Sequence, residues 1–200
     1  MGTDAYGWIE CRPWPDTRST AGPWLAAVDL RLLNISRNYR AFACLFGVRN
    51  EHFAPIAAGR GMPRDASAEV RAAPDSYDHS TSWITYAEVE QIDWDEPLAA
   101  PNERITHYRH GPDGPVATGA LGWTPDFGRL TGMTPSSLHR IEESWPDQDQ
   151  WDAGDILYRY EPTPRRDVEG LDAWAPVWAA MKLLADLHGS QNVRLTVWFG

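Results

Sequence analysis

Three arginines with small or amide neighbours are the most informative residues for chemistry. Arg37, Arg49 and Arg60 lie within 24 residues, and each stands beside asparagine or glycine. Guanidinium groups bind phosphate, sulfate or carboxylate through paired hydrogen bonds, and free backbone N–H groups around Gly59 and Gly61 would add donors. We therefore predict an anion-binding pocket lined by the three arginines. The alternative is that each arginine is a surface residue or pairs with one of the 28 acidic side chains.

Polar and aromatic neighbours of these arginines extend the predicted substrate-binding set. Its other members are Asn38, Tyr39, Asn50, Ser80, Ser82 and Trp83. The run His79-Ser80-Thr81-Ser82-Trp83 offers hydroxyl groups and an imidazole beside a flat aromatic ring. A Ser–His catalytic pair is one alternative, but the nucleophile elbow is missing. We expect these side chains to hydrogen-bond a ligand or a loop, with His79 as a proton carrier if it titrates near neutrality.

Two carboxylates frame the first expected strand. Asp4 precedes it and Glu10 lies within it. A carboxylate in such a place acts as a general base or holds a substrate ammonium group, unless it is an edge or surface charge. The predicted catalytic residues are therefore Asp4, Glu10 and His79.

The sequence offers few metal ligands. Cys11 and Cys44 are the two cysteines, too few for a disulfide framework or a cysteine-based metal site. The histidines lack metal-binding spacing, apart from the weak pair His107 and His110. We predict no metal and no cofactor, and reduced cysteines in a cytoplasmic protein.

Charge and hydropathy restrict the partners. The net charge is −10, which argues against general nucleic-acid binding because phosphates need a basic surface. Lys182 is the only lysine among 18 basic residues, which indicates codon bias or a preference for guanidinium donors. The chain lacks both a signal-peptide pattern and a run of ~20 apolar residues, so we expect no membrane association.

The aromatic content is high, with eleven tryptophans. Most are expected in the core, and several could line an aromatic pocket or cage a cation. In the segment 142–155, acidic residues are interleaved with Trp145 and Trp151. This segment is predicted to be a solvated surface, or else a lid or a surface for a protein partner.

The pattern of hydrophobic residues predicts mixed elements. We expect strands at 6–12, 82–85, 105–110, 116–123 and 192–199, and helices at 39–46, 65–73, 85–92 and 171–187. The segment 24–33 fits a strand or a short helix, and the turn at Ala21-Gly22-Pro23 favours the strand. Regular βαβ spacing is missing, so the predicted class is α+β, with a mainly antiparallel sheet, short helices and one longer C-terminal helix packed on it. The length favours a single domain over residues 1–200.

Four short stretches resemble a family of small uncharacterised phage and actinobacterial proteins. They are Met-Gly-x-Asp at 1–4, the pattern RNYxxFxxLxGVRN at 37–50, RGxPxDxS at 60–67 and HSxSW at 79–83, and the likeness spans about the first 95 residues. Phage-type members begin Gly-Cys-Asp-Ile-His, whereas this chain has Gly2-Thr3-Asp4-Ala5-Tyr6. Asp4 is kept, but thiol or metal chemistry based on the missing Cys and His is not carried over. The resemblance implies no particular activity.

A looser similarity in size links the chain with small proteins of aziridine antibiotic biosynthesis. The chemistry it implies is displacement of sulfate by an amine within one molecule. The leading hypothesis is therefore a cofactor-independent enzyme of specialised metabolism acting on a small anionic metabolite. In it the arginines stabilise departing sulfate or phosphate while a base takes the proton of the attacking amine. The alternative is a phage-derived sequestering or anti-defence protein for a nucleotide signal, and the third hypothesis is a subunit with a protein partner or a homodimer.

Overall fold

The computed structural model describes residues 2–13, 22–33, 35–50, 53–73, 80–97, 104–140, 150–161 and 164–200. The chain groups into two compact units. The first comprises Met1–Glu51, Pro55–Asp93 and Val168–Gly200, and the second comprises His52–Ala54 and Trp94–Asp167. A single domain over residues 1–200 stays a prediction.

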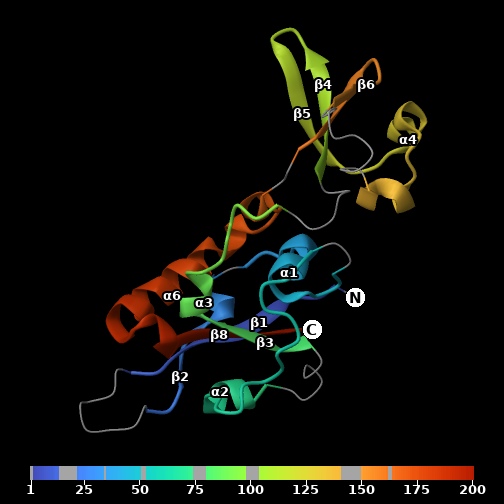
Figure 1. Ribbon diagram of the computed structural model, residues 1–200. Helices are drawn as coiled ribbons and strands as arrows, with labels where there is room; N and C mark the ends of the chain where they lie inside the picture. Colours follow the sequence, from blue (N-terminus) through green and yellow to red (C-terminus); the bar gives the residue numbers. More distant parts are fainter. Residues whose placement is uncertain are drawn as a thin grey trace. The chain divides into compact units, whose positions relative to one another are not determined.

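The first unit is built on a four-stranded antiparallel sheet of order β2-β1-β8-β3 (Figure 1). Its strands are β1 (Ala5–Cys11), β2 (Leu25–Asp29), β3 (Ser82–Thr85) and β8 (Val193–Phe199). The central pair is β1 with β8, from Ala5 opposite Phe199 to Cys11 opposite Val193. This pairing joins the two ends of the described chain in the middle of the sheet.

One face of this sheet is apolar and carries the core of the unit. Successive side chains of a strand point to opposite faces, and Ile9, Leu195 and Val197 are fully buried on this one. Helix α6 (Ala175–His188) contacts β1 and β8. Aromatic rings complete the layer, with the ring centroids of Phe42 and Phe199 5.0 Å apart.

The opposite face of the sheet is polar and aromatic. Facing positions in neighbouring strands share a side of the sheet. We call it the polar-aromatic face, and it comprises Tyr6, Trp8, Glu10, Asp29, Trp83, Arg194, Thr196 and Trp198. The short helix α2 (Ala68–Arg71) lies on this side, where Ala66 and Val70 pack against Trp198. The predicted alternation along the first and last strands is therefore confirmed.

Helix α1 (Tyr39–Phe46) has the predicted bounds because both end signals are local. The Asn38 side chain accepts hydrogen bonds from the backbone N–H groups of Arg40 and Ala41. Gly47 ends the helix in the left-handed conformation with φ 72°, which glycine adopts without a Cβ penalty. Residues 41–46 are buried, so the helix is anchored in the core.

The other helices of the first unit also follow their predicted caps. Ser67 caps α2, and helix α3 (Tyr86–Val89) begins with a capping box between Thr85 and Glu88. Pro176 lies in the first turn of α6, where a missing N–H is tolerated. Short 3-10 segments occupy Leu30–Leu33, Asp172–Trp174 and Ser190–Asn192.

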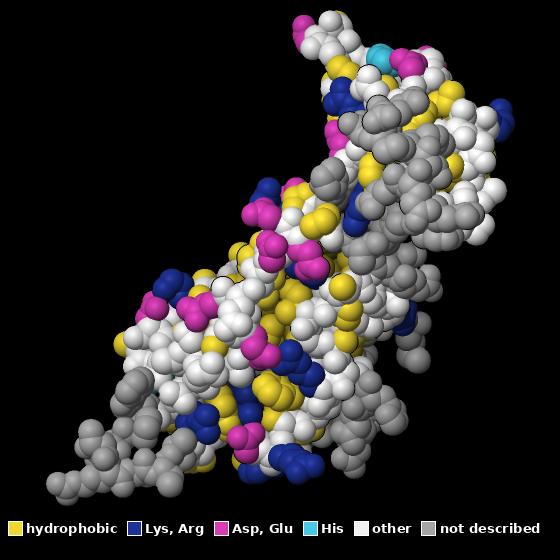
Figure 2. Space-filling view, in the orientation of Figure 1, with side chains coloured by type: hydrophobic (Ala, Val, Ile, Leu, Met, Phe, Trp, Pro, Cys, Tyr) yellow, Lys and Arg dark blue, Asp and Glu magenta, His cyan; other side chains and the backbone are white. Residues whose placement is uncertain are grey.

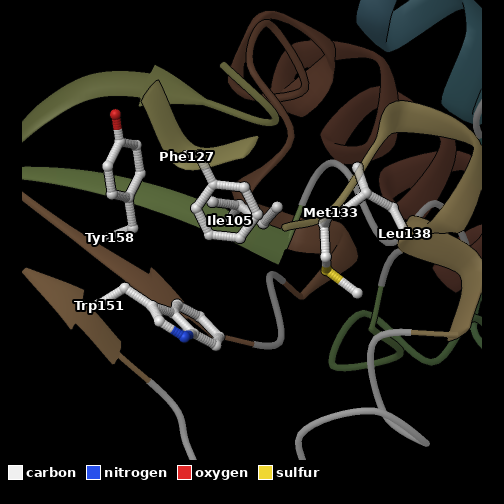
Figure 3. Close-up of a cluster of buried hydrophobic side chains, with 6 residues drawn as sticks. All are labelled: Ile105, Phe127, Met133, Leu138, Trp151 and Tyr158. Carbon is white, nitrogen blue, oxygen red and sulfur yellow. The ribbon is translucent and has the colours of Figure 1, made fainter. Parts of the chain in front are cut away.

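The second unit has its own antiparallel sheet of order β5-β4-β7-β6. Its elements are β4 (Ile105–Gly111), β5 (Gly114–Leu121), α4 (Pro125–Thr131), a 3-10 segment at Pro135–Arg140, β6 (Gln150–Asp152), β7 (Ile156–Tyr160) and a 3-10 segment at Arg165–Asp167. Figure 3 shows its core, formed by Ile105, Phe127, Met133, Leu138, Trp151 and Tyr158. The hairpin of β4 and β5 was predicted, whereas β6 and β7 were missed.

The predicted fold class is confirmed. Both sheets are antiparallel, most helices are short, and the longer α6 packs on the first sheet. On the side shown in Figure 2, arginine and carboxylate side chains of the described residues are interspersed. Within the described ranges, no helix has the length and hydrophobicity required to cross a bilayer.

Candidate functional site

Tyr39 is at the centre of a group of charged and polar side chains at one end of the first sheet. Its hydroxyl accepts a hydrogen bond of 3.0 Å from the backbone N–H of Thr3. The guanidinium carbon of Arg49 lies 4.7 Å from the centroid of the Tyr39 ring. Arg49 Nη2 also donates to Thr3 Oγ1 at 3.0 Å. We call Thr3, Asp4, Arg37, Tyr39 and Arg49 the Tyr39 cluster.

Arg37 and Asp4 form a two-pronged ion pair within this cluster. Arg37 Nε lies 2.7 Å from Asp4 Oδ1, and Nη2 lies 2.6 Å from Oδ2. Gly2 allows this arrangement, because a Cβ there would lie 1.6 Å from Arg37 Nη1. The hydrogen bond from Arg37 lowers the pKa of Asp4, which makes Asp4 a weaker base than a free aspartate. Both side chains remain 44% exposed, so a ligand can reach them.

The pKa of Tyr39 is lowered from that of a free tyrosine. The main cause is the hydrogen bond from the Thr3 N–H, and the positive charges of Arg49 and Arg37 act in the same direction. These groups stabilise the phenolate relative to the phenol. Tyr39 therefore releases a proton more readily than an ordinary tyrosine, which suits it to hydrogen-bond donation toward an anion.

Arg49 has an unusual backbone. Among the described residues it is the only non-glycine with a positive φ, at 52°. This left-handed conformation costs an L-residue about 1–2 kcal/mol. Residues held in such conformations cluster at functional sites because the surrounding structure must hold them there. Here the strained residue places its guanidinium on the Tyr39 ring.

The two predicted asparagines lie next to this cluster. Asn38 serves as the cap of α1, with its side-chain oxygen directed to the helix N–H groups. It also lies against Gly170, where an added Cβ would be 2.4 Å from the Asn38 amide carbon. Asn50 follows Arg49 and is partly buried. The binding roles of Asn38 and Asn50 stay predictions.

Arg60 belongs to a second group of side chains, on the polar-aromatic face. Arg60 Nη1 binds Glu88 Oε1 at 2.8 Å, and its guanidinium carbon lies 5.2 Å from the ring centroid of Trp83. The structure therefore brings Arg37 and Arg49 together around Tyr39, and places Arg60 with Glu88 and Trp83. A common pocket for all three arginines stays a prediction.

The two predicted serines hydrogen-bond the backbone. Ser80 Oγ donates to the carbonyl oxygen of Phe199 at 2.8 Å and accepts from its N–H at 3.3 Å. Ser82 Oγ donates to the carbonyl oxygen of Ala57. The Ser82 bond holds the loop before Arg60 on β3, and the Ser80 bonds join the start of β3 to the end of β8. The predicted catalytic residue His79 lies outside the described residues.

Glu10 of β1 is fully buried in a network with the neighbouring strand β8 and with the cap residue of α2. Its carboxylate accepts hydrogen bonds from the Ser67 N–H at 2.6 Å, Arg194 Nε at 2.7 Å and Thr196 Oγ1 at 2.7 Å. A carboxylate enclosed by three donors is out of reach of a substrate, so this geometry suits a structural role in holding α2 on the sheet. The prediction of Glu10 as a base therefore gains no support from its position.

The prediction did not include the basic partner of Glu10. Arg194 also donates from Nη1 to Asp65 at 2.7 Å, and its guanidinium carbon lies 4.0 Å from the ring centroid of Trp24. The sequence alternation places Arg194 on the face opposite Val193 and Leu195, and only the structure shows that all seven positions of β8 are buried. A buried charge needs a partner, and Glu10 is the acidic residue of the neighbouring strand whose side chain lies on the same face of the sheet.

Metal ligands are not grouped in the described ranges of the chain, where no cluster of three or more His, Cys, Asp or Glu is placed to hold an ion. Cys11 and Cys44 are buried and form no disulfide within the described residues, and burial raises the pKa of Cys11. Comparison with protein-family models, with curated proteins and with solved structures gave no match.

Proposed function

We propose that the Tyr39 cluster binds the anionic group of a small metabolite. Arg37 and Arg49 carry two positive charges and Asp4 one negative charge, so the cluster keeps one excess positive charge in a chain of net charge −10. Arg37 Nη1 and the Tyr39 hydroxyl proton add donors at the same place. Sulfate, phosphate and carboxylate are the groups that such donors recognise.

The observation that carries this proposal is the position of Arg49. Its backbone adopts φ 52° while its guanidinium lies over Tyr39, whose pKa is lowered by the surrounding donors. A strained arginine held against an acidified phenol is a costly arrangement for a surface without a ligand. An anion would interact with both groups at once.

The reaction we propose is displacement of sulfate or phosphate by an amine of the same molecule. The nitrogen forms a bond to the carbon, the carbon–oxygen bond breaks, and the leaving group departs with the electron pair. The arginines stabilise the charge that develops on the leaving oxygen. Asp4 is the predicted base that lies in this cluster, and it would take the proton that the nitrogen loses.

The test combines binding and turnover with purified protein. Sulfated and phosphorylated amino alcohols are titrated by calorimetry at low salt, and release of inorganic sulfate or phosphate is measured. Arg49→Ala should weaken binding about ten- to hundredfold, as expected for a charge-assisted hydrogen bond. Arg64→Ala removes an exposed arginine outside the cluster and should have no effect. Equal affinities of the two variants would reject the site.

A second function is favoured by the Arg60 group. The Trp83 ring lies under a guanidinium that is itself paired with Glu88, an arrangement suited to stacking on a nucleobase. Under this alternative the chain sequesters a nucleotide signal. Tight stoichiometric binding of a nucleotide without product would support it over the enzyme. The partner surface predicted at 142–155 lies largely outside the described residues.

A further inference from the structure

The polar-aromatic face carries a cavity of about 370 Å³. The side chains that shape it are Tyr6, Trp8, Asp29, Arg31, Glu69 and Trp198. They come from β1, from the end of β2 and the residues after it, from α2 and from β8. Cavities that hold small ligands measure about 300–1,000 Å³. This one therefore suits a ligand of roughly the size of an aromatic amine.

Three aromatic side chains form one side of the cavity. Tyr6 and Trp198 face one another in the register of β1 and β8, and Trp8 is the next residue of β1 on that side. Val70 and Ala66 pack against Trp198, which is only 7% exposed. These contacts hold the rings in place. The face of an aromatic ring attracts a cation, tryptophan most strongly.

The charged residues of the cavity leave one carboxylate without a partner. Arg31 donates to Asp29 from Nε at 2.9 Å and from Nη2 at 2.5 Å, so these two charges neutralise each other. Glu69 is exposed and, within the described part of the chain, has no hydrogen-bond or ion-pair partner. The cavity therefore combines aromatic rings with one uncompensated negative charge.

We infer that this cavity binds a small organic cation, an ammonium group on an apolar body. The apolar body lies against Tyr6, Trp8 and Trp198, and the ammonium group pairs with Glu69. An anion is disfavoured because Asp29 neutralises Arg31 and the carboxylate of Glu69 would repel a second negative charge. This site does not depend on the Tyr39 cluster and goes beyond the function proposed for it.

The probes are three compounds of similar shape and different charge. The phenethylammonium ion is compared with neutral 2-phenylethanol and anionic 3-phenylpropanoate, by calorimetry at low salt and by ligand-observed NMR. The ammonium ion should bind most tightly, with 2-phenylethanol weaker and 3-phenylpropanoate weakest. Binding of the ammonium ion should weaken as salt is added, because screening reduces exposed charge interactions. A preference for 3-phenylpropanoate, or no binding of the ammonium ion, would overturn the inference.

Variants locate the site. Glu69→Gln keeps the shape and removes the charge, so it should weaken ammonium binding about fivefold while leaving 2-phenylethanol unchanged. Glu169→Gln makes the same change at an exposed residue outside the cavity and should have no effect. Trp8→Leu should weaken the binding of both phenethylammonium and 2-phenylethanol. The melting temperature of this variant is measured to verify that it folds. Equal affinities of Glu69→Gln and Glu169→Gln would reject the role of Glu69.

The same variants separate this inference from the anion site. Sulfate binding should weaken in Arg49→Ala and stay unchanged in Glu69→Gln, whereas ammonium binding should weaken in Glu69→Gln and stay unchanged in Arg49→Ala. If ammonium binding is lost together with sulfate binding in Arg49→Ala, the two ligands share one site and the inference of a separate cation site fails. If Arg49→Ala does not weaken sulfate binding but Glu69→Gln weakens ammonium binding, the proposed function is rejected and the cation site is supported.

Discussion

The buried pair of Glu10 and Arg194 makes the sharpest prediction about stability. The two side chains are 0% and 4% exposed, and their atoms Oε2 and Nε are 2.7 Å apart. Arg194→Met keeps most of the volume and removes the charge. It leaves the Glu10 carboxylate buried with donors only from Ser67 and Thr196, and it breaks the bond to Asp65.

The size of the loss follows from this geometry. Removing one partner of a buried ion pair costs about 3–5 kcal/mol, because the other charge is left without compensation. Arg194 Nη2 is itself buried with no hydrogen-bond partner among the described residues, and its removal recovers part of that cost. We therefore expect a loss of about 3–4 kcal/mol in the free energy of unfolding. For a chain of this size the melting temperature should fall by about 6–16 °C.

The assay is urea and thermal unfolding followed by circular dichroism. The double variant Glu10→Gln with Arg194→Met removes the uncompensated charge and should recover at least half of the loss, since glutamine can still accept from the Ser67 N–H. Lys182→Met breaks an exposed pair with Asp186 and should change stability by less than about 0.5 kcal/mol. A loss below about 1 kcal/mol in Arg194→Met, or no recovery in the double variant, would refute the reasoning.

Three further predictions concern single groups. The pKa of Tyr39 is lowered, chiefly by the Thr3 N–H, so ultraviolet titration should show one tyrosine that ionises below pH about 10, and Tyr39→Phe should abolish it. The hydrogen bond from Arg31 lowers the pKa of Asp29, so its stabilising effect is present above pH about 3.9 and is lost as pH falls through the folded value. Urea unfolding is measured at pH values from about 5 down to about 2, and the midpoint of Asp29→Asn should change less over this range than that of the wild type. Asn38→Ala removes the cap of α1 and should cost about 1 kcal/mol in urea unfolding, whereas an unchanged midpoint would contradict the capping role.

Local signals predicted most elements of the first unit, although the strand expected at 24–33 ends at Asp29 and is followed by a 3-10 segment at Leu30–Leu33. Asn38 and Gly47 marked the two ends of α1, and Thr85 with Glu88 marked the start of α3. Each signal acts within a few residues, through a side chain that satisfies a nearby backbone group. The alternation of the last strand was equally local. Such features do not depend on the rest of the fold.

Features that depend on distant pairing were not predicted. Strand β7 pairs with β4 on one side and with the short β6 on the other, and nothing in the sequence indicates that register. The division into two sheets was missed for the same reason. Strand propensity reports a suitable side chain, whereas the partner strand is chosen by packing across the whole sheet.

The candidate site was predicted in part. Asp4, Arg37, Tyr39 and Arg49 were all named from their types, and the structure places them in one cluster. The ion pair between Asp4 and Arg37 joins residues 33 positions apart, and sequence spacing alone does not reveal such a contact. Thr3 was missed because its main contribution is a backbone N–H, which every residue other than proline has.

The pairing of β1 with β8 has a consequence for synthesis on the ribosome. The central ladder of the first sheet joins Ala5–Cys11 to Val193–Phe199, so β1 must wait for nearly the whole described chain to be translated. The second sheet lies within 105–160 and needs no later segment for its strand pairing. Nascent β1 therefore keeps an unpaired edge during translation, and such edges bind chaperones or one another.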